Sequence, residues 1–399
     1  MRIAVDLFCG AGGLSEGLRL AGYTPALGVD IDPVALRSYR ANHPETSIIE
    51  TDIANLSRRS VLRGCGNEEI DLLAGGPSCQ GFSTHGKRRQ DDPRNSLLRE
   101  MLRVARETKP RFVLLENVAG LRSYGRGAFE AEIAAEFSRS GYSVASGVLN
   151  AADFGVPQLR KRIVFIGTRL DLPLAMPAPT HYPPGQLMPT GLERHVTVGE
   201  ALGDLPLLGR NLEQAEWDYA SPPMCAFQEY ARFGVAADSK VTLHQAHKPS
   251  DNALRIISRL QEGQKLRDLP DHLLPDRFKR MRTISDGSLR RDCTTLYGRL
   301  DRGKPAYTIT CYFRNVASGA FTHPVEDRTL SYREAARLMS FRDSYVFHGP
   351  RLPRQIGNAV PPLLAAALGR TVLALDEGRR TAASRACTGR EFVELGAVT

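Results

Sequence analysis

Hydrophobic positions in the first 170 residues fall into two patterns, short uninterrupted apolar segments and longer segments with one apolar face. The first pattern is typical of buried strands, and the second is typical of helices that cover a sheet. The predicted strands are Ile3–Leu7, Thr24–Val29, Ser47–Ile49, Ile70–Ala74, Phe112–Leu115, Ser143–Leu149 and Ile163–Gly167, and the predicted helices are Leu14–Ala21, Pro33–Asn42, Ser96–Thr108 and Ala128–Arg139. This alternation predicts an α/β fold with a mostly parallel, doubly wound sheet, in which ligands bind beyond the carboxyl ends of the strands.

The pattern changes after this region. Residues 173–189 contain six prolines, which predicts a linker. From 190 to 325 the periodicity weakens, and short elements with polar loops predict a second, smaller and irregular domain. Ser331–Phe341 and Pro361–Asp376 are helical again, whereas the last ~20 residues have no clear pattern and are expected to be disordered.

The composition is that of a globular protein, with 42% hydrophobic and 24% charged residues among 399, which is enough for two domains. No segment reaches the ~18 uninterrupted apolar residues of a membrane span. The nearest, 359–375, contains two prolines and Arg370. The amino terminus enters a strand pattern at once, so we expect neither a signal peptide nor a membrane contact.

Charge and cysteine usage narrow the choice of partner and compartment. The net charge of +9 is spread along the chain and favours a polyanionic partner, although an arginine-rich composition alone also produces such a value. The seven cysteines include no CxxC pair, which argues against a disulfide framework or a zinc site and for a reducing cytoplasm. We therefore expect a cytoplasmic protein without a metal.

A glycine-rich turn, Gly10-Ala11-Gly12-Gly13, follows the first predicted strand. Glycines at such a place let backbone amides approach a ligand at the start of a helix. Asp30 ends the second strand 20 residues after Gly10, where an acid commonly binds ribose hydroxyls. Nicotinamide enzymes and S-adenosylmethionine enzymes share this pair, and Ser15 in place of the third glycine favours the second class. Asp52, after the third strand, is either another cofactor contact or a helix cap.

Cys79 lies in the loop Gly75-Gly76-Pro77-Ser78-Cys79-Gln80-Gly81-Phe82-Ser83, directly after a predicted strand. The Gly-Gly-Pro start fits neither a helix nor a central strand. A thiol held in such a loop is placed for nucleophilic chemistry. Most free cysteines, however, are small buried hydrophobic residues, so the loop alone leaves both interpretations open.

Further polar side chains are expected near this loop. Glu116 follows the strand Phe112–Leu115 and faces either the crevice of Cys79 or solvent. Gln158, Arg160 and Arg162 share one face of an extended segment, because side chains alternate with a period of two. Two guanidiniums on one face indicate either recognition of a phosphate or planar base, or a solvated edge.

Taken in order, these segments resemble the DNA (cytosine-5)-methyltransferase family. The matching motifs are DLFCGAGGLSEGL, GVDID, TDI, GGPSCQGFS, ENV, QLRKR and RQIGNAVPP, which span nearly the whole chain apart from about 175–325. The resemblance implies a Rossmann-like methyltransferase that moves a methyl group from S-adenosylmethionine to C5 of cytosine in double-stranded DNA. It also implies a covalent bond between the Cys79 thiolate and C6 of a cytosine flipped out of the duplex.

The resemblance implies a role for each matching residue. Glu116 would bind N3 and the exocyclic amine of the cytosine, Arg162 would bind its O2, and Arg160 would steady the thiolate or a phosphate. The implied cofactor contacts are Phe8, Gly10, Gly12, Gly13, Asp30, Ile31, Asp52, Pro77, Asn358 and Val360. The implied DNA contacts are Gln80, Ser83, Lys87, Arg88, Arg89 and Arg299. Most of these DNA contacts belong to the basic segment Ser83–Asn95, which either closes over the flipped base or is a basic loop without that role.

Asn358 and Val360 are far along the chain from the other cofactor residues, so the resemblance implies a discontinuous catalytic domain. We expect this domain to comprise 1–175 and 350–378. A target-recognition domain at 176–330 would read base edges in the major groove. Residues 331–349 would form a hinge and return helix, and 379–399 a tail.

Three residues depart from the family pattern. Ser78 replaces a second proline before the cysteine, and Met339 and Arg342 replace a glutamine and a proline. No reacting group is lost, so we expect an active enzyme. The alternatives are a tRNA cytosine methyltransferase of the same fold, a non-catalytic DNA-binding paralogue and, more distantly, a nicotinamide oxidoreductase. We expect a bacterial monomer that is associated with the nucleoid through DNA, with a restriction endonuclease as a functional rather than physical partner.

Overall fold

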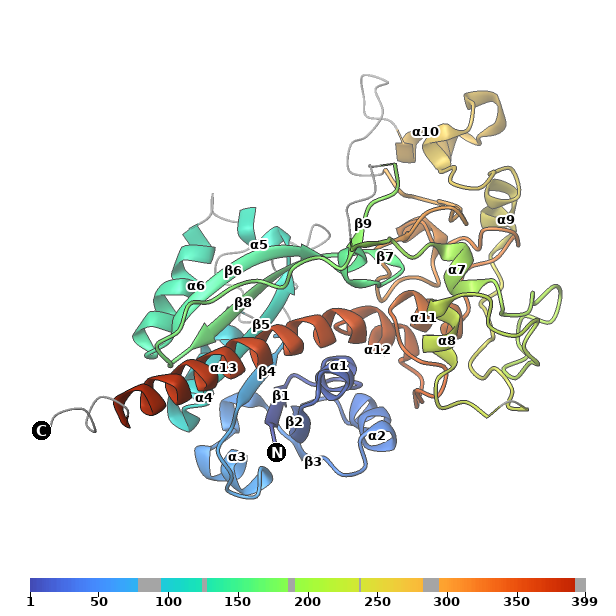
Figure 1. Cartoon of the computed structure of the whole chain (residues 1–399). Helices are drawn as coiled ribbons and strands as arrows, with labels where there is room; N and C mark the ends of the chain where they lie inside the picture. The colour runs from blue at the N-terminus through green and yellow to red at the C-terminus, as the bar shows by residue number, and fades with distance from the viewer. Residues whose placement is uncertain (78–94, 124–127, 186–190, 237, 283–293, 392–399) are drawn as a thin grey trace, which may run out of the picture.

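The computed structural model describes residues 1–77, 95–123, 128–185, 191–236, 238–282 and 294–391, without the side chains of 379–391. Its centre is a seven-stranded sheet (Figure 1). Every neighbouring pair is parallel except the two pairs of β8, which runs antiparallel to β5 and to β6. In spatial order the strands are β3 (Ser47–Glu50), β2 (Thr24–Asp30), β1 (Ile3–Leu7), β4 (Leu72–Gly75), β5 (Phe112–Val118), β8 (Lys161–Thr168) and β6 (Ser143–Asn150).

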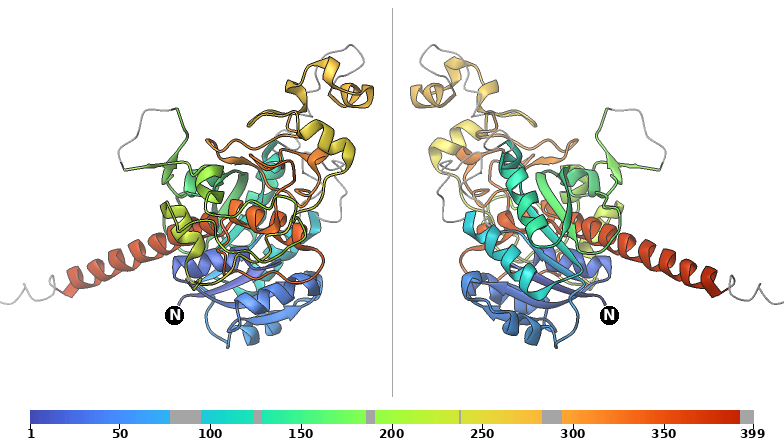
Figure 2. Two further views of the ribbon diagram at one scale, coloured as in Figure 1. Left: turned by 90° about the vertical axis from the view of Figure 1, so that its right-hand side faces the viewer. Right: turned by 90° about the vertical axis from the view of Figure 1, so that its left-hand side faces the viewer.

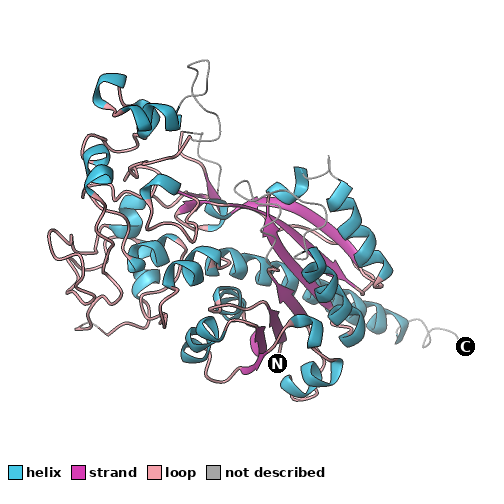
Figure 3. Ribbon diagram, turned by 180° about the vertical axis from the view of Figure 1, so that it is seen from behind, coloured by secondary structure: helices cyan, strands magenta, loops and turns pink. Residues whose placement is uncertain are grey.

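Helices cover both faces of this sheet, because its central strands are apolar on both sides. In β1, Val5 and Leu7 belong to the core on one face, and Ala4 belongs to the core on the other. The first core includes side chains of α3 (Arg58–Gly64), α4 (Asn95–Thr108) and α6 (Ala128–Arg139), and the second includes those of α1 (Gly13–Ala21) and α13 (Pro362–Glu391). Figure 3 shows the two layers from behind. The predicted α/β, doubly wound fold is confirmed.

A close helix pair brings the two ends of the chain together. A Cβ atom on Gly17 of α1 would lie 2.3 Å from the carbonyl oxygen of Pro362 and 2.4 Å from Cβ of Ala365. One on Gly13 would lie 2.5 Å from the carbonyl oxygen of Val360. Glycine is therefore needed at both positions, because no side chain fits between the backbones. Beyond this contact, α13 extends away from the body of the molecule (Figure 2).

The rest of the chain consists of short elements, as its weak periodicity predicts. Strand pairs form between β7 (Gln158–Leu159) and β11 (Ala306–Tyr307), and between β9 (His181–Tyr182) and β10 (Glu193–Arg194). The remaining α-helices are α2 (Pro33–Asn42), α5 (Gly120–Ser123), α7 (Val198–Leu202), α8 (Ala226–Arg232), α9 (Asp251–Ile257), α10 (Asp276–Arg282), α11 (Tyr332–Leu338) and α12 (Leu352–Asn358). The 3₁₀ turns are Ile53–Asn55, Ala151–Phe154, Leu266–Asp268, Asp271–Leu273 and Val316–Ser318.

Residues from 198–241 and 300–356 share a hydrophobic core that also includes Ala11 of the glycine-rich turn, and residues from 253–297 form a separate core with Val316. A buried ion network lies beside it. Arg337 donates to both Asp343 oxygens, at 2.9 and 2.6 Å, and to Asp204. The segment predicted to be a hinge is thus packed on both neighbouring regions. The division into domains stays a prediction.

Among the described residues, one helical stretch, Leu352–Gly378, is long and apolar enough to cross a membrane by length and composition. Half of its apolar window is buried inside the molecule. Packing of α13 against α1 accounts for that apolar character, as in the core helix of a globular protein.

Candidate active site

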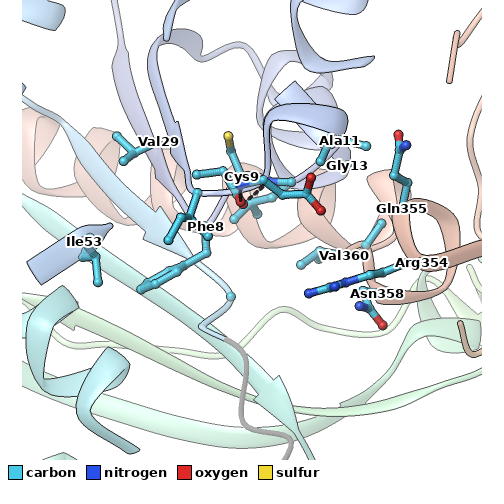
Figure 4. Close-up of a pocket in the computed structure, with 18 of the residues that line it drawn as sticks. Phe8, Cys9, Ala11, Gly13, Val29, Ile53, Arg354, Gln355, Asn358 and Val360 are labelled. Carbon is cyan, nitrogen blue, oxygen red and sulfur yellow. Dashed lines mark hydrogen bonds between the residues drawn. The ribbon is translucent and has the colours of Figure 1, made fainter. Parts of the chain in front are cut away.

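A cavity of about 280 Å³ opens at the carboxyl edge of the sheet, next to the point where the strand order reverses between β1 and β4 (Figure 4). Its wall comes from the turns after β1, β2 and β3, from the segment after β4, from Glu116 of β5 and from α12 with the residues that follow it. Ligands of doubly wound sheets bind at this edge. The volume is near the lower end of small-molecule sites, which begin at roughly 300 Å³.

The turn after β1 has an unusual backbone that shapes the cavity. Phe8, Gly10 and Gly12 have φ values of 62°, 52° and 99°, all in the left-handed region. Gly12 N donates to the carbonyl oxygen of Cys9 over 2.8 Å, which closes the turn. A non-glycine residue at such a φ costs of order 1–3 kcal/mol, so the surrounding structure must hold Phe8 in place.

Asp30, at the end of β2, holds this turn in place through hydrogen bonds to backbone N–H groups. Its Oδ2 accepts from Gly10 N and its Oδ1 from Asp32 N, each over 2.8 Å. Burial raises the pKa of the Asp30 carboxyl, and these backbone donors oppose that rise. Three backbone donors, from Gly10, Ile31 and Asp32, do not fill the four lone-pair sites of the carboxylate, so it can still accept from a ligand hydroxyl.

Asp6 lies inside the same region and explains Ser15, the residue that stands where a third glycine was expected. Oδ2 of Asp6 accepts from Ser15 N over 3.1 Å and from Ser15 Oγ over 2.7 Å. Oδ1 has no hydrogen-bond partner within the described part of the chain. Burial raises the pKa of Asp6 to about 7.

Glu116 and Arg162 form an ion pair at the far wall of the cavity. Arg162 Nε lies 2.8 Å from Glu116 Oε1, across the antiparallel strands β5 and β8. Glu116 is only 8% exposed and lines the cavity. Burial lowers the pKa of the Arg162 guanidinium, and the Glu116 carboxylate acts in the opposite direction. The pair therefore presents a carboxyl group in a fixed orientation to whatever occupies the cavity.

The start of the Cys79 loop lies against this pair. A Cβ on Gly76 would be 3.2 Å from Oε2 of Glu116. Asn117 Nδ2 donates to the carbonyl oxygen of Pro77 over 3.1 Å, which ties the loop to β5. Cys79 itself lies outside the described residues.

Comparison with known proteins decides the family. The sequence profile of the C-5 cytosine-specific DNA methylases matches residues 3–374. The chain belongs to this family.

Similar proteins include Type II methyltransferases and solved methyltransferase structures. The methylase is 37% identical to the Type II methyltransferase M1.HphI of Haemophilus parahaemolyticus, over 93% of this chain and 87% of that one. It is 34% identical to M.DdeI of Desulfomicrobium norvegicum, over 92% and 88% of the two chains. A solved E. coli prophage protein described as a DNA modification methyltransferase matches with a TM-score of 0.72 and 26% identity, covering 94% of this chain and all of that one. The Dnmt2 methyltransferase of S. pombe, at 16% identity and a TM-score of 0.54, shares the fold alone.

Methylases of this family use S-adenosylmethionine, and the donor set of the cavity fits it. Ile31, with 63% of its surface exposed, offers an apolar contact beside the Asp30 carboxylate, a pairing that suits a base attached to a ribose. Eight of the ten predicted cofactor residues line the cavity, namely Phe8, Gly10, Gly13, Asp30, Ile31, Asp52, Asn358 and Val360.

Gly12 and Pro77 are not among the residues that line the cavity. A Cβ on Gly12 would lie 2.6 Å from Tyr345 Oη and 2.8 Å from His43 Nε2, so this glycine is required for packing. Pro77 is buried, and its carbonyl oxygen accepts from Asn117. Both residues therefore lie outside the cavity lining and hold neighbouring residues in place.

Several residues that line the cavity were not predicted from the sequence, among them Cys9, Thr51, Ile53, Leu97 and Arg354. Cys9, Thr51 and Ile53 are direct neighbours of predicted residues. Their place in the same turns was the sequence signal that could have identified them. Arg354 lies one helical turn before Asn358, a spacing that places both on one side of α12. Asp52 caps the 3₁₀ turn after β3 through Ala54 N, at 2.9 Å, and also lines the cavity, so its cap role is confirmed and its cofactor contact stays a prediction.

Arg160 occupies a different place from the one expected. It is buried, with Nη1 donating to the carbonyl oxygen of Ile309 over 2.9 Å and Nη2 to those of Gly357 and Ala359 over 3.1 and 3.0 Å. Three of its five N–H donors are thus committed to backbone carbonyl oxygens, whereas Nε has no hydrogen-bond partner among the described residues. In this methylase Arg160 joins β8 to the segments on either side of Asn358.

The prediction that Arg299 contacts DNA is wrong. The residue is 5% exposed, and its guanidinium donates to the carbonyl oxygens of Ile257, Leu260, His323 and Glu326 and to the Asp327 carboxylate. The other predicted DNA contacts, Gln80, Ser83, Lys87, Arg88 and Arg89, lie outside the described residues. Within the described ranges, no group of three or more His, Cys, Asp and Glu side chains is arranged to hold a metal ion.

Proposed function

We propose that this methylase transfers a methyl group to C5 of a cytosine that has been flipped out of duplex DNA, through a covalent bond between Cys79 Sγ and cytosine C6. The observation that carries the proposal is the Glu116–Arg162 pair at the wall of the cofactor cavity. It places a fixed carboxyl group next to Gly76, three residues before the proposed nucleophile.

The reaction needs each of these groups. C5 of cytosine is a weak nucleophile, and addition of the Cys79 thiolate to C6 gives C5 the electron density to take a methyl group. S-adenosylmethionine supplies that methyl group on a sulfonium. The proton on C5 is then removed, the bond between C6 and Cys79 Sγ breaks, and the electron pair of the C5–H bond restores the ring double bond. The thiolate leaves as it entered.

Glu116 binds N3 and the exocyclic amine in this proposal and so stabilises charge on the ring as C6 is attacked. Arg162 fixes the carboxyl group through its Nε and binds O2 of the base. The target atom is inaccessible in a stacked duplex, so the base must be extruded at a cost of a few kcal/mol. The basic segment 83–95, with Gln80, Ser83, Lys87, Arg88 and Arg89 at or beside it, is proposed to meet the DNA around the extruded base.

The similar Type II methyltransferases support a place in a restriction-modification system, with a companion endonuclease that cuts the same unmethylated sequence. Residues 176–330 are proposed to supply the sequence reading, and the enzyme is proposed to work as a monomer on cytoplasmic DNA.

The test is a covalent trap. Duplex DNA with 5-fluorocytosine at the target position cannot lose its C5 substituent as a proton, so the enzyme should remain bound to it through Cys79. Bisulfite sequencing of DNA from cells that express the methylase identifies the target sequence first. Cys79→Ser should give no adduct, whereas Cys225→Ser, which removes a partly exposed thiol far along the chain, should trap like wild type. An adduct in Cys79→Ser would refute the proposed nucleophile.

Glu116→Gln tests the second group. The amide keeps the size of the side chain but cannot reproduce the charge that the attacked ring requires, so turnover should fall at least a hundredfold. Binding of S-adenosylhomocysteine, measured by calorimetry, should change little. Turnover within twofold of wild type would remove Glu116 from the mechanism.

A further inference from the structure

The described side chains that line the cavity carry more negative than positive charge. The described residues that line it include four acids, Asp30, Asp32, Asp52 and Glu116, but a single cation, Arg354. A ligand that carries a carboxylate would meet repulsion on most sides. An unpaired carboxylate at a partly desolvated site is costly unless donors or a cation face it.

Arg354 is presented to the cavity by a rigidly held helix. The neighbouring Gln355 accepts from Ser38 Oγ over 2.6 Å and donates to the carbonyl oxygen of His348 over 2.7 Å. On the other side, a Cβ on Gly357 would lie 2.3 Å from the carbonyl carbon of Thr310. These contacts leave α12 no room to turn. Arg354 and Asn358, one helical turn apart, both lie on the α12 side of the cavity, across from Phe8 (Figure 4).

The Arg354 guanidinium is exposed and has neither an ion pair nor a hydrogen bond to any other described side chain. Arg351, the N-cap residue of the same helix, differs in this respect, because its Nη1 lies 3.8 Å from Asp32 Oδ2. An arginine carries five donors in a planar fork that matches a carboxylate. Arg354 is therefore a cation of the cavity that the protein itself leaves uncommitted.

We infer that Arg354 binds the carboxylate of the methionine part of S-adenosylmethionine. The inference rests on the proposed use of that cofactor and assigns one of its groups to one side chain. The acids on the opposite wall suit the ribose hydroxyls and the cationic sulfonium and amine, and Arg354 suits the one anionic group. The competing ligand is a DNA phosphate, since a guanidinium binds both anions. The position of Arg354 in the same cavity as Phe8, Gly10 and Asp30 favours the cofactor.

The experiment compares two ligands in two variants by calorimetry. S-adenosylhomocysteine carries the carboxylate, and its decarboxylated analogue keeps the adenosine, the sulfur and the amine. Arg354→Gln should weaken binding of S-adenosylhomocysteine by roughly ten- to a hundredfold and leave the analogue within twofold of wild type. Arg370→Gln, which removes an exposed cation from α13, is the control for net charge and should change neither.

The possible outcomes distinguish a cofactor contact from a DNA phosphate contact at Arg354. Equal losses for both ligands, or no loss for either, would overturn the assignment to the carboxylate. Unchanged cofactor binding with weaker DNA binding and a salt dependence reduced by about one charge would identify a phosphate contact instead and overturn it too. Failure of the wild-type enzyme to bind S-adenosylhomocysteine at all would count against the proposed function itself.

Discussion

Replacing Gly17 with alanine should separate the two helices that carry the cofactor turn and its opposite wall. The added Cβ would meet a backbone oxygen at 2.3 Å and a Cβ at 2.4 Å, where ordinary contacts begin at 3.4 Å. The two backbones must therefore move apart by about 1 Å, since neither clashing atom is the end of a flexible side chain. Overpacking of this kind costs typically 1–3 kcal/mol.

The substitution also has a favourable component, because alanine is about 1 kcal/mol better than glycine inside a helix. Gly378 of α13 provides a matched control, since a Cβ there meets nothing within 4 Å. Gly378→Ala should thus be stabilising by up to about 1 kcal/mol, whereas Gly17→Ala, taken at the upper end of the overpacking range, should be destabilising by about 2 kcal/mol. The difference between the two variants isolates the packing cost.

Urea unfolding of both variants measures that difference, and calorimetry with S-adenosylhomocysteine measures its effect on the cavity. Gly17→Ala should bind the ligand more weakly, because α1 begins at the cofactor turn. Identical shifts in the urea midpoint for the two variants would show that α1 and α13 are not in contact as described. The reasoning from the glycine pair would then fail.

Two further predictions concern buried polar groups. Arg160→Lys keeps the charge but cannot reach three carbonyl oxygens, so it should lower the free energy of unfolding by about 2–5 kcal/mol and weaken cofactor binding. Wild-type stability with lost turnover would instead indicate that Arg160 acts at the thiolate. Asp6 has a folded-state pKa of about 7, above its unfolded value of about 3.9, so its protonated form favours folding and this contribution is lost as pH rises from about 4 to 7. Asp6→Asn has no carboxyl group to ionise at this position. Thermal unfolding should therefore show that the stability of the wild type, relative to the variant, falls by about 2–3 kcal/mol between pH 5 and pH 8, whereas parallel pH profiles would contradict the raised pKa.

The sheet and many of the residues that line the cavity were predictable because they depend on local pattern and one topological rule. Strands buried on both faces leave uninterrupted apolar segments, and the carboxyl ends of parallel strands meet at one edge. Phe8, Asp30 and Asp52 follow three such strands and do line one cavity. The short helix α3 was not predicted, because Val61 is its only buried residue and supplies no apolar period.

The rest depended on contacts between distant residues, which a period cannot reveal. Arg160 and Arg162 share a face of one extended segment, yet one binds the carbonyl oxygen of Ile309 and the other binds Glu116. Gly12 and Gly13 are adjacent and alike, but only Gly13 lines the cavity, because Tyr345 packs against Gly12.

Two departures from the family pattern also became interpretable only in three dimensions. Arg342, where a proline was expected, stacks its guanidinium 4.6 Å from the Phe233 ring and lies 4.0 Å from Glu16 of α1. Met339 Sδ is 3.1 Å from Gln158 Nε2. Arg342 thus connects α1 to the short-element region, and Met339 contacts β7. Ser78 lies outside the described residues.

The pairing of α1 with α13 has a consequence for the timing of biosynthesis. A ribosome delivers Gly17 first and the Pro362 turn more than 300 residues later, so the surface of α1 and of the sheet that α13 covers stays exposed until almost the entire polypeptide has emerged. Because Arg354, Asn358 and Val360 also arrive late, the cavity of a nascent chain stays incomplete while residues 176–330 are still being synthesised. The chain order therefore completes residues 176–330, which are proposed to read the DNA sequence, before it completes the cavity.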